Sequence, residues 1–167
     1  TTTPERIAEP GASFRVPPSK PAPYERRLDS PAALCFTSGT EGKPRAVVLT
    51  HGNFLWSALV SGRNLGVRAN DLWLACLPLH HVGGLSVLTR SAYYGTAVLL
   101  HDRFDPDAVN AAIDHDGVTL LSLVPPMLAR LLQARGEHPF PSTLRAALIG
   151  GGPAPLDLLR HAARLGM

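Results

Sequence analysis

The sequence predicts an α/β fold, with a mostly parallel, doubly wound sheet and helices on both faces. From residue 32 onward, short apolar runs alternate with segments in which apolar residues recur at helical spacing. The runs are continuously apolar, as in strands that are covered on both faces of a parallel sheet. Strands that alternate with helices of this length form βαβ units, and such units build a doubly wound sheet.

The elements can be placed in order along the chain. The apolar runs predict strands at residues 33–37, 46–50, 72–77, 96–100, 118–124 and 144–149. Apolar stripes predict helices around Phe54, Leu55, Ala58, Leu59 and Leu65; Ala108, Val109, Ala112 and Ile113; Met127, Leu128, Leu131 and Leu132; and Leu156, Leu159, Ala163 and Leu165, after Pro155. Asp105 and Pro106 are typical of an N-cap and a first helical residue. Gly166 is typical of a helix end.

Proline is dense at the start of the chain, at Pro4, Pro10, Pro17, Pro18, Pro21, Pro23 and Pro31. Proline fixes φ and removes a backbone donor, which disfavours helix and central strand. We therefore expect residues 1–31 to form a connector or edge segment, with a short edge strand at 13–16. Residues 32–167 form the α/β domain. Because the sequence stops directly after a predicted helix, we expect it to be part of a longer protein.

Composition narrows the class of protein. The 167 residues are 45% hydrophobic and 17% charged, with a net charge of +3, which suits one domain with a real core and an anionic small ligand. The arginines are scattered, which argues against nucleic acid. Cys35 and Cys76 lie in apolar runs without metal-ligand spacing, so we expect reduced thiols in the cytoplasm. No apolar run has the ~18 residues of a membrane span.

A glycine-rich segment follows the first predicted strand. Residues 36–46 read Phe-Thr-Ser-Gly-Thr-Glu-Gly-Lys-Pro-Arg-Ala. Its glycines can turn backbone N–H groups inward, its hydroxyls can donate further hydrogen bonds, and Lys43 and Arg45 can offset phosphate charge. The spacing is not that of a Walker A loop, because two residues separate Gly39 from Gly42 and Pro44 follows the lysine. An ordinary turn between hairpin strands is the alternative.

This segment resembles the phosphate-binding motif of adenylate-forming enzymes, which include acyl-CoA ligases, luciferases and peptide-synthetase adenylation domains. That motif has the form Tyr/Phe-Thr-Ser-Gly-Thr-Thr-Gly-x-Pro-Lys-Gly. Here Glu41 replaces a hydroxyl residue, Arg45 replaces lysine and Ala46 replaces glycine. Arg45 keeps the positive charge, in a planar form. A carboxylate at Glu41 repels phosphate unless Mg²⁺ or a neighbouring cation intervenes.

Three further segments match the family in its order. Residues 77–84 resemble Pro-Leu-Phe-His-x-x-Gly, which places His81 on the family histidine beside the acyl group and the phosphates. The alternatives are a histidine that caps a helix and, for His80 with His81, a metal pair; no carboxylate or cysteine is spaced to complete a metal site. Residues 122–127 resemble the acyl-pocket wall, although a core strand with a proline-started helix explains them too. Residues 148–155 resemble the glycine element beside adenine.

The resemblance implies an AMP-forming acid:CoA ligase, with ATP and Mg²⁺ as cofactors and CoA as cosubstrate. It assigns Thr37, Ser38, Gly39, Thr40, Glu41, Gly42, Lys43, Gly150, Gly151 and Gly152 to the nucleotide. It also assigns His81, Ser122, Val124 and Pro125 to the acid, and His81, Lys43 and Arg45 to catalysis. Residues 71–74, 88–96, 122–125 and 144–148 most resemble o-succinylbenzoate:CoA ligases of menaquinone biosynthesis.

The same resemblance covers only part of the large N-terminal domain of such enzymes, so we expect this piece alone to be inactive. Fatty-acid and aryl-acid ligases remain alternatives for the substrate. A non-catalytic nucleotide-binding module derived from a ligase is the rival class, favoured by Glu41 and opposed by His81 and the loop hydroxyls. The implied partners are small molecules, and the sequence leaves homo-oligomerisation open.

Overall fold

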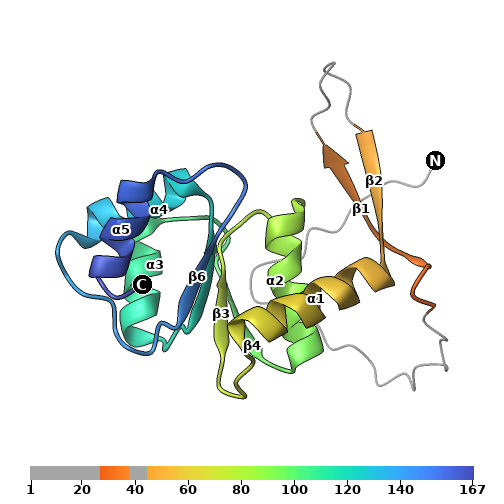
Figure 1. Cartoon of the computed structure of the whole chain (residues 1–167), viewed down its shortest axis with the longest axis horizontal. Coiled ribbons are helices and arrows are strands. Elements are labelled where there is room, and N and C mark those ends of the chain that lie inside the picture. The colour runs from red at the N-terminus through yellow and green to blue at the C-terminus, as the bar shows by residue number, and fades with distance from the viewer. Residues whose placement is uncertain (1–26, 38–44) are drawn as a thin grey trace, which may run out of the picture.

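The computed structural model describes residues 27–37 and 45–167 (Figure 1). Most of the predicted connector, with the edge strand expected at 13–16, lies outside the described residues. The elements in chain order are β1 (Pro31–Thr37), β2 (Arg45–Thr50), α1 (His51–Leu65), β3 (Leu72–Ala75), α2 (Val82–Tyr94), β4 (Ala97–Leu100), α3 (Pro106–His115), β5 (Leu120–Leu123), α4 (Pro125–Arg135), β6 (Ala146–Ile149) and α5 (Leu156–Arg164).

The central sheet has four strands in the order β4-β3-β5-β6, and every neighbouring pair is parallel. The chain leaves β3 through α2 to reach β4 on one side. It then returns through α3 to β5 on the other side of β3. The direction of winding therefore changes between β3 and β5. This confirms the predicted doubly wound parallel sheet and places its switch point at those two strands.

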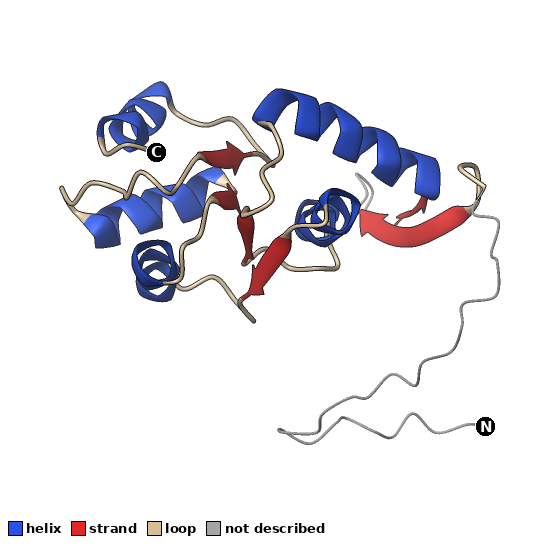
Figure 2. Ribbon diagram, turned by 90° about the horizontal axis from the view of Figure 1, so that it is seen from below, coloured by secondary structure: helices blue, strands red, loops and turns tan. Residues whose placement is uncertain are grey.

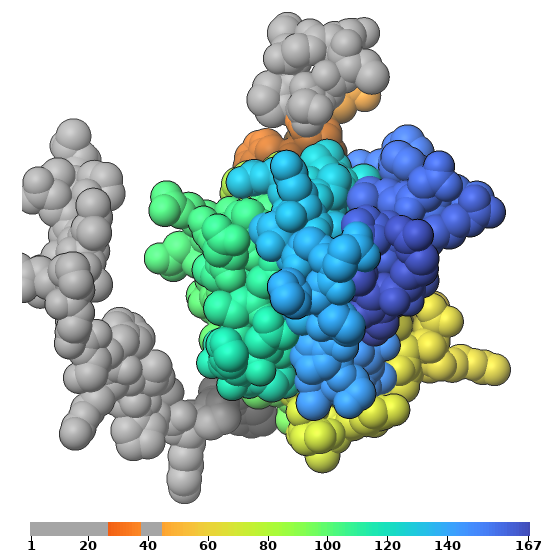
Figure 3. Space-filling view, turned by 90° about the vertical axis from the view of Figure 1, so that its left-hand side faces the viewer, coloured from red at the N-terminus to blue at the C-terminus, as the bar shows by residue number. Residues whose placement is uncertain are grey.

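Helices cover both faces of the sheet, as predicted (Figure 2). On one face Trp73, Ala75 and Leu120 form a core with Val87 of α2, and α1 packs on α2 (Figure 1). On the other face Leu74, Leu121 and Leu123 pack with residues of α3, α4 and α5. Figure 3 shows the segments from α3 to α5 as one continuous layer on that side. Adjacent strand residues point to opposite cores, which is why these strands are apolar throughout.

The strands β1 and β2 differ from the prediction. Their apolar runs predict strands covered on both faces, yet they pair antiparallel with each other in a separate two-stranded sheet. Leu34 and Phe36 are 62% and 63% exposed. The expectation was wrong for this pair because a short apolar run does not distinguish a buried parallel strand from a hairpin strand. The glycine-rich segment accordingly joins two antiparallel strands.

Local signals at the helix ends account for the boundaries. The Thr50 side chain accepts a hydrogen bond from the Asn53 backbone and the Asn53 side chain accepts one from the Thr50 backbone, so a capping box starts α1. Asp105 caps α3 and Pro106 is its first residue, as predicted. Gly166 follows α5 with a φ of +93°, and its N–H donates to the Ala163 carbonyl. The predicted helix end at Gly166 is confirmed.

Helix α2 was not among the helices predicted from apolar spacing. Its buried residues are Gly84, Ser86, Val87 and Ser91, so small residues occupy most of the face that large apolar residues usually fill. A Cβ at Gly84 would lie 2.4 Å from the Pro78 carbonyl oxygen. The first turn of α2 can therefore approach the preceding loop only with glycine there.

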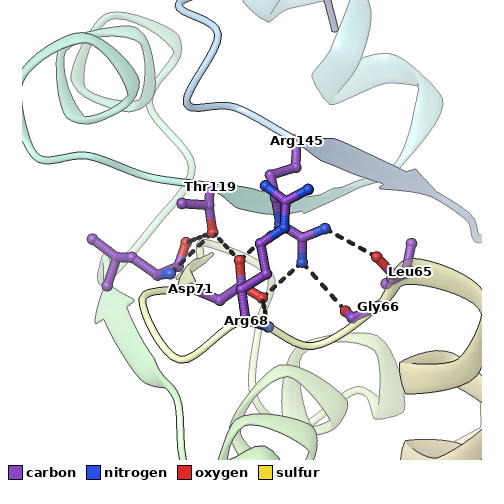
Figure 4. A network of polar contacts seen from close by, with 7 residues as sticks. Leu65, Gly66, Arg68, Asp71, Thr119 and Arg145 are labelled. Carbon is purple, nitrogen blue, oxygen red and sulfur yellow. Dashed lines mark hydrogen bonds and ion pairs between the residues drawn. The ribbon is translucent and has the colours of Figure 1, made fainter.

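A closed polar network joins the amino ends of three strands (Figure 4). Asp71 lies just before β3, Thr119 just before β5 and Arg145 just before β6. The Arg145 guanidinium donates to both carboxylate oxygens of Asp71, at 2.8 and 2.7 Å, and to the carbonyls of Leu65 and Gly66 at the end of α1. Thr119 donates to Asp71 at 2.9 Å. Burial favours a raised pKa for Asp71, but these hydrogen bonds and the Arg145 charge hold its pKa below the usual range.

The two cysteines carry free thiols. Cys76 is buried, and burial raises the pKa of its thiol to about 11, so the reactive thiolate is scarce at neutral pH. Cys35 is only half-buried, although it lies in an apolar run of the sequence. Among the described residues, no helix combines the length and the apolar character that crossing a bilayer requires.

Candidate functional site

A cavity of about 740 Å³ opens at the switch point of the sheet. Its wall contains residues from the loop after β3, from the end of β5 and from the segment after β6. In doubly wound sheets the carboxyl ends of the strands at the switch point form a crevice in which ligands bind. The volume lies within the range of about 300–1,000 Å³ that is typical of small-molecule sites.

The loop between β3 and α2 brings His81 to this cavity. His81 is the N-cap residue of α2, but its side chain makes no capping hydrogen bond. The capping alternative for this histidine therefore explains its position in the backbone and does not involve its imidazole. The His80 ring lies beside it, with ring centroids 4.2 Å apart.

The carboxyl end of β5 provides Ser122 and Val124, which the sequence predicted in the substrate site. The Ser122 side chain shares a face of the sheet with Trp73, whose indole Nε1 donates to Ser122 Oγ at 3.1 Å. Pro125, the fourth residue predicted to bind substrate, does not line this cavity. It lines a neighbouring cavity of about 630 Å³, which shares Val124 and Gly151 with the first.

The three glycines after β6 lie along the border of both cavities. Gly150 and Gly151 line the larger one, and Gly151 and Gly152 line the smaller one. A Cβ at Gly150 or Gly152 would meet no atom within 4 Å, whereas one at Gly151 would lie 3.0 Å from Val124 and would require a φ of +78°. The close contact with Val124 and the positive φ thus explain why glycine is needed at position 151, but not at positions 150 and 152. At the other two positions the missing side chain leaves a flat backbone surface open, which fits a planar base such as adenine.

The structure places few residues of the glycine-rich segment. Thr37 ends β1 and Arg45 begins β2, with the Thr37 hydroxyl donating to the Arg45 carbonyl at 3.4 Å. Ser38, Gly39, Thr40, Glu41, Gly42 and Lys43 lie outside the described residues. The nucleotide roles predicted for the whole segment, and the catalytic roles of Lys43 and Arg45, stay predictions.

Arg90 is a cavity residue that the sequence analysis did not single out. It is the only charged residue of α2, which is the signal that could have found it. Its guanidinium donates to Ser57 of α1 at 3.1 Å and lies 5.9 Å from the Trp73 ring centroid. Its buried Nε–H has no acceptor, and no carboxylate pairs with it, in the part of the chain that the structure describes.

Burial lowers the pKa of Arg90, with a weaker opposing effect from Tyr94, and the guanidinium stays charged because the ordinary pKa of arginine is so high. A partly buried cation costs free energy unless an anion accompanies it. The cavity therefore carries a positive charge suited to an anionic group. Within residues 27–37 and 45–167, no three His, Cys, Asp or Glu side chains cluster as metal ligands.

A cationic cavity at the switch point of a parallel sheet is typical of doubly wound α/β domains whose ligands are small anions. The open backbone surface at Gly150 and Gly152 leaves room for a planar base. The chain belongs to the AMP-binding enzyme family, which matches residues 2–167.

Curated relatives include 2-succinylbenzoate–CoA ligases. The chain is 48% identical over 143 residues to that of Bacillus cytotoxicus, covering 86% of this chain and 30% of the relative. It is 46% identical, with the same coverage, to that of Bacillus cereus strain Q1. The chain thus spans about 30% of the length of these relatives.

Solved structures of such enzymes are also similar to this chain. An o-succinylbenzoate CoA synthetase of Bacillus subtilis in complex with the acyl-adenylate intermediate OSB-AMP matches with a TM-score of 0.79 and 45% identity, over 84% of this chain and 29% of that one. The same enzyme with ATP and magnesium ion matches with a TM-score of 0.78, 45% identity and the same coverage. ATP-bound MatB of Rhodopseudomonas palustris matches at 0.75 and 26%, over 84% of this chain and 28% of that one.

Proposed function

We propose that the chain is the acid-binding and adenine-binding part of a 2-succinylbenzoate–CoA ligase. The relatives support the class of reaction. The choice of substrate rests on the environment of Arg90. 2-Succinylbenzoate has one carboxylate on its succinyl arm, which reacts, and a second on its ring. A partly buried guanidinium that has no carboxylate partner among the described residues suits that second carboxylate, since charge-assisted hydrogen bonds are the strong ones. A fatty acid offers no such group.

The proposed chemistry has two steps. First, a carboxylate oxygen attacks the α-phosphorus of ATP, and the bond to pyrophosphate breaks, leaving an acyl-adenylate. The CoA thiolate then attacks the acyl carbon, and the carbon–oxygen bond to AMP breaks. His81 lies at the cavity and its imidazole makes no capping hydrogen bond, so it can orient the reacting carboxylate. Gly150 and Gly152 leave room for the base, and Ser122 and Val124 border the acyl group.

Magnesium, when bound, neutralises charge on the phosphates. It is typically held by one or two carboxylates together with phosphate oxygens, so no three-residue protein cage is needed. Lys43 and Arg45 add positive charge for the leaving pyrophosphate in this proposal. The free thiols suit a reducing compartment, and we place the reaction in the cytoplasm.

Acid-dependent ATP–pyrophosphate exchange tests the proposal. It is measured on a ligase of the relatives' full length that carries residues 1–167, here called the full-length ligase. The acids are 2-succinylbenzoate, its analogue 3-benzoylpropanoate without the ring carboxylate, a fatty acid and benzoate. Exchange that is fastest with 2-succinylbenzoate is expected. Exchange only with fatty acid or benzoate would contradict the substrate, and no exchange with any acid would favour a non-catalytic nucleotide-binding module.

Arg90→Met in the same assay tests the residue on which the choice of substrate rests. We expect kcat/KM for 2-succinylbenzoate to fall by about tenfold or more, the effect of one lost charge-assisted hydrogen bond. The value for 3-benzoylpropanoate should change little. Equal losses for both acids would mean that Arg90 does not bind the ring carboxylate. Residues 1–167 by themselves should form no thioester.

A further inference from the structure

Trp73 lies directly behind the cavity wall and contacts two of its polar residues. Its side chain is fully buried in the core between the sheet and α2, and it does not itself line the cavity. The indole Nε1 donates to Ser122 Oγ at 3.1 Å, and the Arg90 guanidinium lies 5.9 Å from the ring centroid. One rigid side chain therefore contacts both a hydroxyl and a cation of the cavity.

The hydrogen bond from Trp73 determines what Ser122 can do. A hydroxyl has one proton to donate and two lone pairs that accept. An indole N–H can only donate, so it occupies a lone pair of Ser122 and leaves the hydroxyl proton for another acceptor. Among the described residues, none accepts that proton. Ser122 is nearly buried at the cavity wall, so a ligand oxygen in the cavity is the acceptor that remains within reach.

The same indole also restricts Arg90. The long arginine side chain has several rotamers, and its hydrogen bond to Ser57 and its contact with the Trp73 ring limit them. The donor hydroxyl and the guanidinium thus contact one buried indole, and both residues line the same cavity. A carboxylate has two oxygens, and it can accept from both groups at once.

We propose that Trp73 is a positioning residue for acid recognition. It presents Ser122 as a hydrogen-bond donor and holds Arg90 beside it, so that the two together bind the non-reacting carboxylate of the substrate. Trp73 touches neither the substrate nor the reacting atoms. This inference rests on the proposed function and adds the residue that organises the selective part of the site.

The first experiment compares Trp73→Phe with the wild-type full-length ligase in ATP–pyrophosphate exchange. Phenylalanine keeps an aromatic ring in the core and removes the N–H. We expect kcat/KM for 2-succinylbenzoate to fall about tenfold, the effect of about 1.4 kcal/mol. KM for ATP and kcat/KM for 3-benzoylpropanoate should stay within about twofold, since the analogue has no ring carboxylate.

Trp56→Phe is the matched control, because Trp56 is the other tryptophan and is 62% exposed on α1. It should behave as wild type with both acids. A Trp73→Phe enzyme that loses equal activity with both acids, or whose KM for ATP rises in parallel, has a general structural defect, and the positioning role is then wrong. A wild-type enzyme that adenylates no 2-succinylbenzoate overturns the proposed function as well.

A second measurement needs no substitution of the buried tryptophan, which matters if Trp73→Phe does not fold. With ¹⁵N-labelled tryptophan in the wild-type full-length ligase, the indole N–H resonances of Trp73 and Trp56 are followed while each acid is added. The Trp73 resonance should shift with 2-succinylbenzoate and much less with 3-benzoylpropanoate, whereas the exposed Trp56 resonance should stay unchanged. In Ser122→Ala the selective shift should disappear. A Trp73 resonance that ignores saturating 2-succinylbenzoate overturns the inference.

Discussion

The charged groups at the two ends of the parallel strands differ in their hydrogen-bond partners. At the amino ends, Asp71 and Arg145 satisfy each other with two hydrogen bonds, and the remaining donors reach carbonyls at the end of α1 (Figure 4). At the carboxyl ends, Arg90 has only the Ser57 hydroxyl as a hydrogen-bond acceptor among the described residues, and His81 makes no capping bond. The charged groups at the amino ends have their partners without a ligand, whereas the site at the carboxyl ends is suited to one.

This difference indicates how one sheet separates stability from function. Charges that are paired inside the protein hold β3, β5 and β6 together, so their loss should destabilise the domain. A charge that lacks a protein partner costs stability in the free protein and gains its partner when an anion binds. Substitutions at the two edges should therefore have opposite consequences, and the predictions below test this.

The largest effect on stability is expected at the amino edge. Asp71→Ala leaves the Arg145 guanidinium buried without its anion and removes the acceptor for Thr119 and for the Arg68 backbone. Removing one partner of a buried pair costs about 3–5 kcal/mol, and we expect a loss of that size in urea unfolding followed by circular dichroism. Asp157→Ala is the control, since its ion pair with Arg160 is exposed and should contribute almost nothing. Equal losses in the two variants would contradict the comparison.

The same pair predicts a smaller, pH-dependent effect. The folded state holds the pKa of Asp71 below its usual value, so the unfolded state binds the proton more readily. The stability that this group contributes is fully present above the unfolded pKa of about 3.9 and is lost as the pH falls through the lower folded pKa. The stability difference between wild type and Asp71→Asn should thus narrow as the pH falls from about 5 through the acid range. A difference that is constant over this range would show that the charge contributes nothing.

Alanine substitutions at the neighbouring glycines after β6 should have unequal effects on stability and on AMP affinity. Gly151→Ala forces a φ of +78° on a residue with a Cβ that meets Val124 at 3.0 Å, and we expect a loss of about 1–2 kcal/mol. Gly150→Ala meets nothing within 4 Å, so its stability should match wild type while its affinity for AMP, measured by calorimetry on the full-length ligase, falls. If Gly150→Ala binds AMP normally, the open glycine surface does not border the base.

Only a small effect on stability is expected at Arg90. Arg90→Met removes a partly buried cation and keeps apolar volume, so the unfolding free energy should stay the same or rise by up to about 1 kcal/mol. This result, beside the large loss at Asp71, would sharpen the contrast between the two edges. A loss comparable with that of Asp71→Ala would instead assign Arg90 to the structural core.

The sequence by itself determined the alternation of strands and helices, the helix starts at Asp105 and Pro125, and the family motifs around His81 and Gly150. These features depend on local spacing, caps and backbone freedom, which neighbouring residues specify. It did not reveal α2, because small buried residues replace the apolar stripe there, nor the hairpin pairing of β1 and β2, because pairing joins separate runs.

Only the tertiary structure decided which polar residues meet. Arg90 and Ser57 come from different helices, Trp73 and Ser122 are 49 residues apart, and Asp71 and Arg145 are 74 apart. No local pattern relates such residues, because their contact depends on the strand order β4-β3-β5-β6 and on how α1 and α2 pack over it. The sheet order places one ion pair at the amino ends of the strands, and at the cavity it places an arginine that pairs with no carboxylate of residues 27–37 and 45–167.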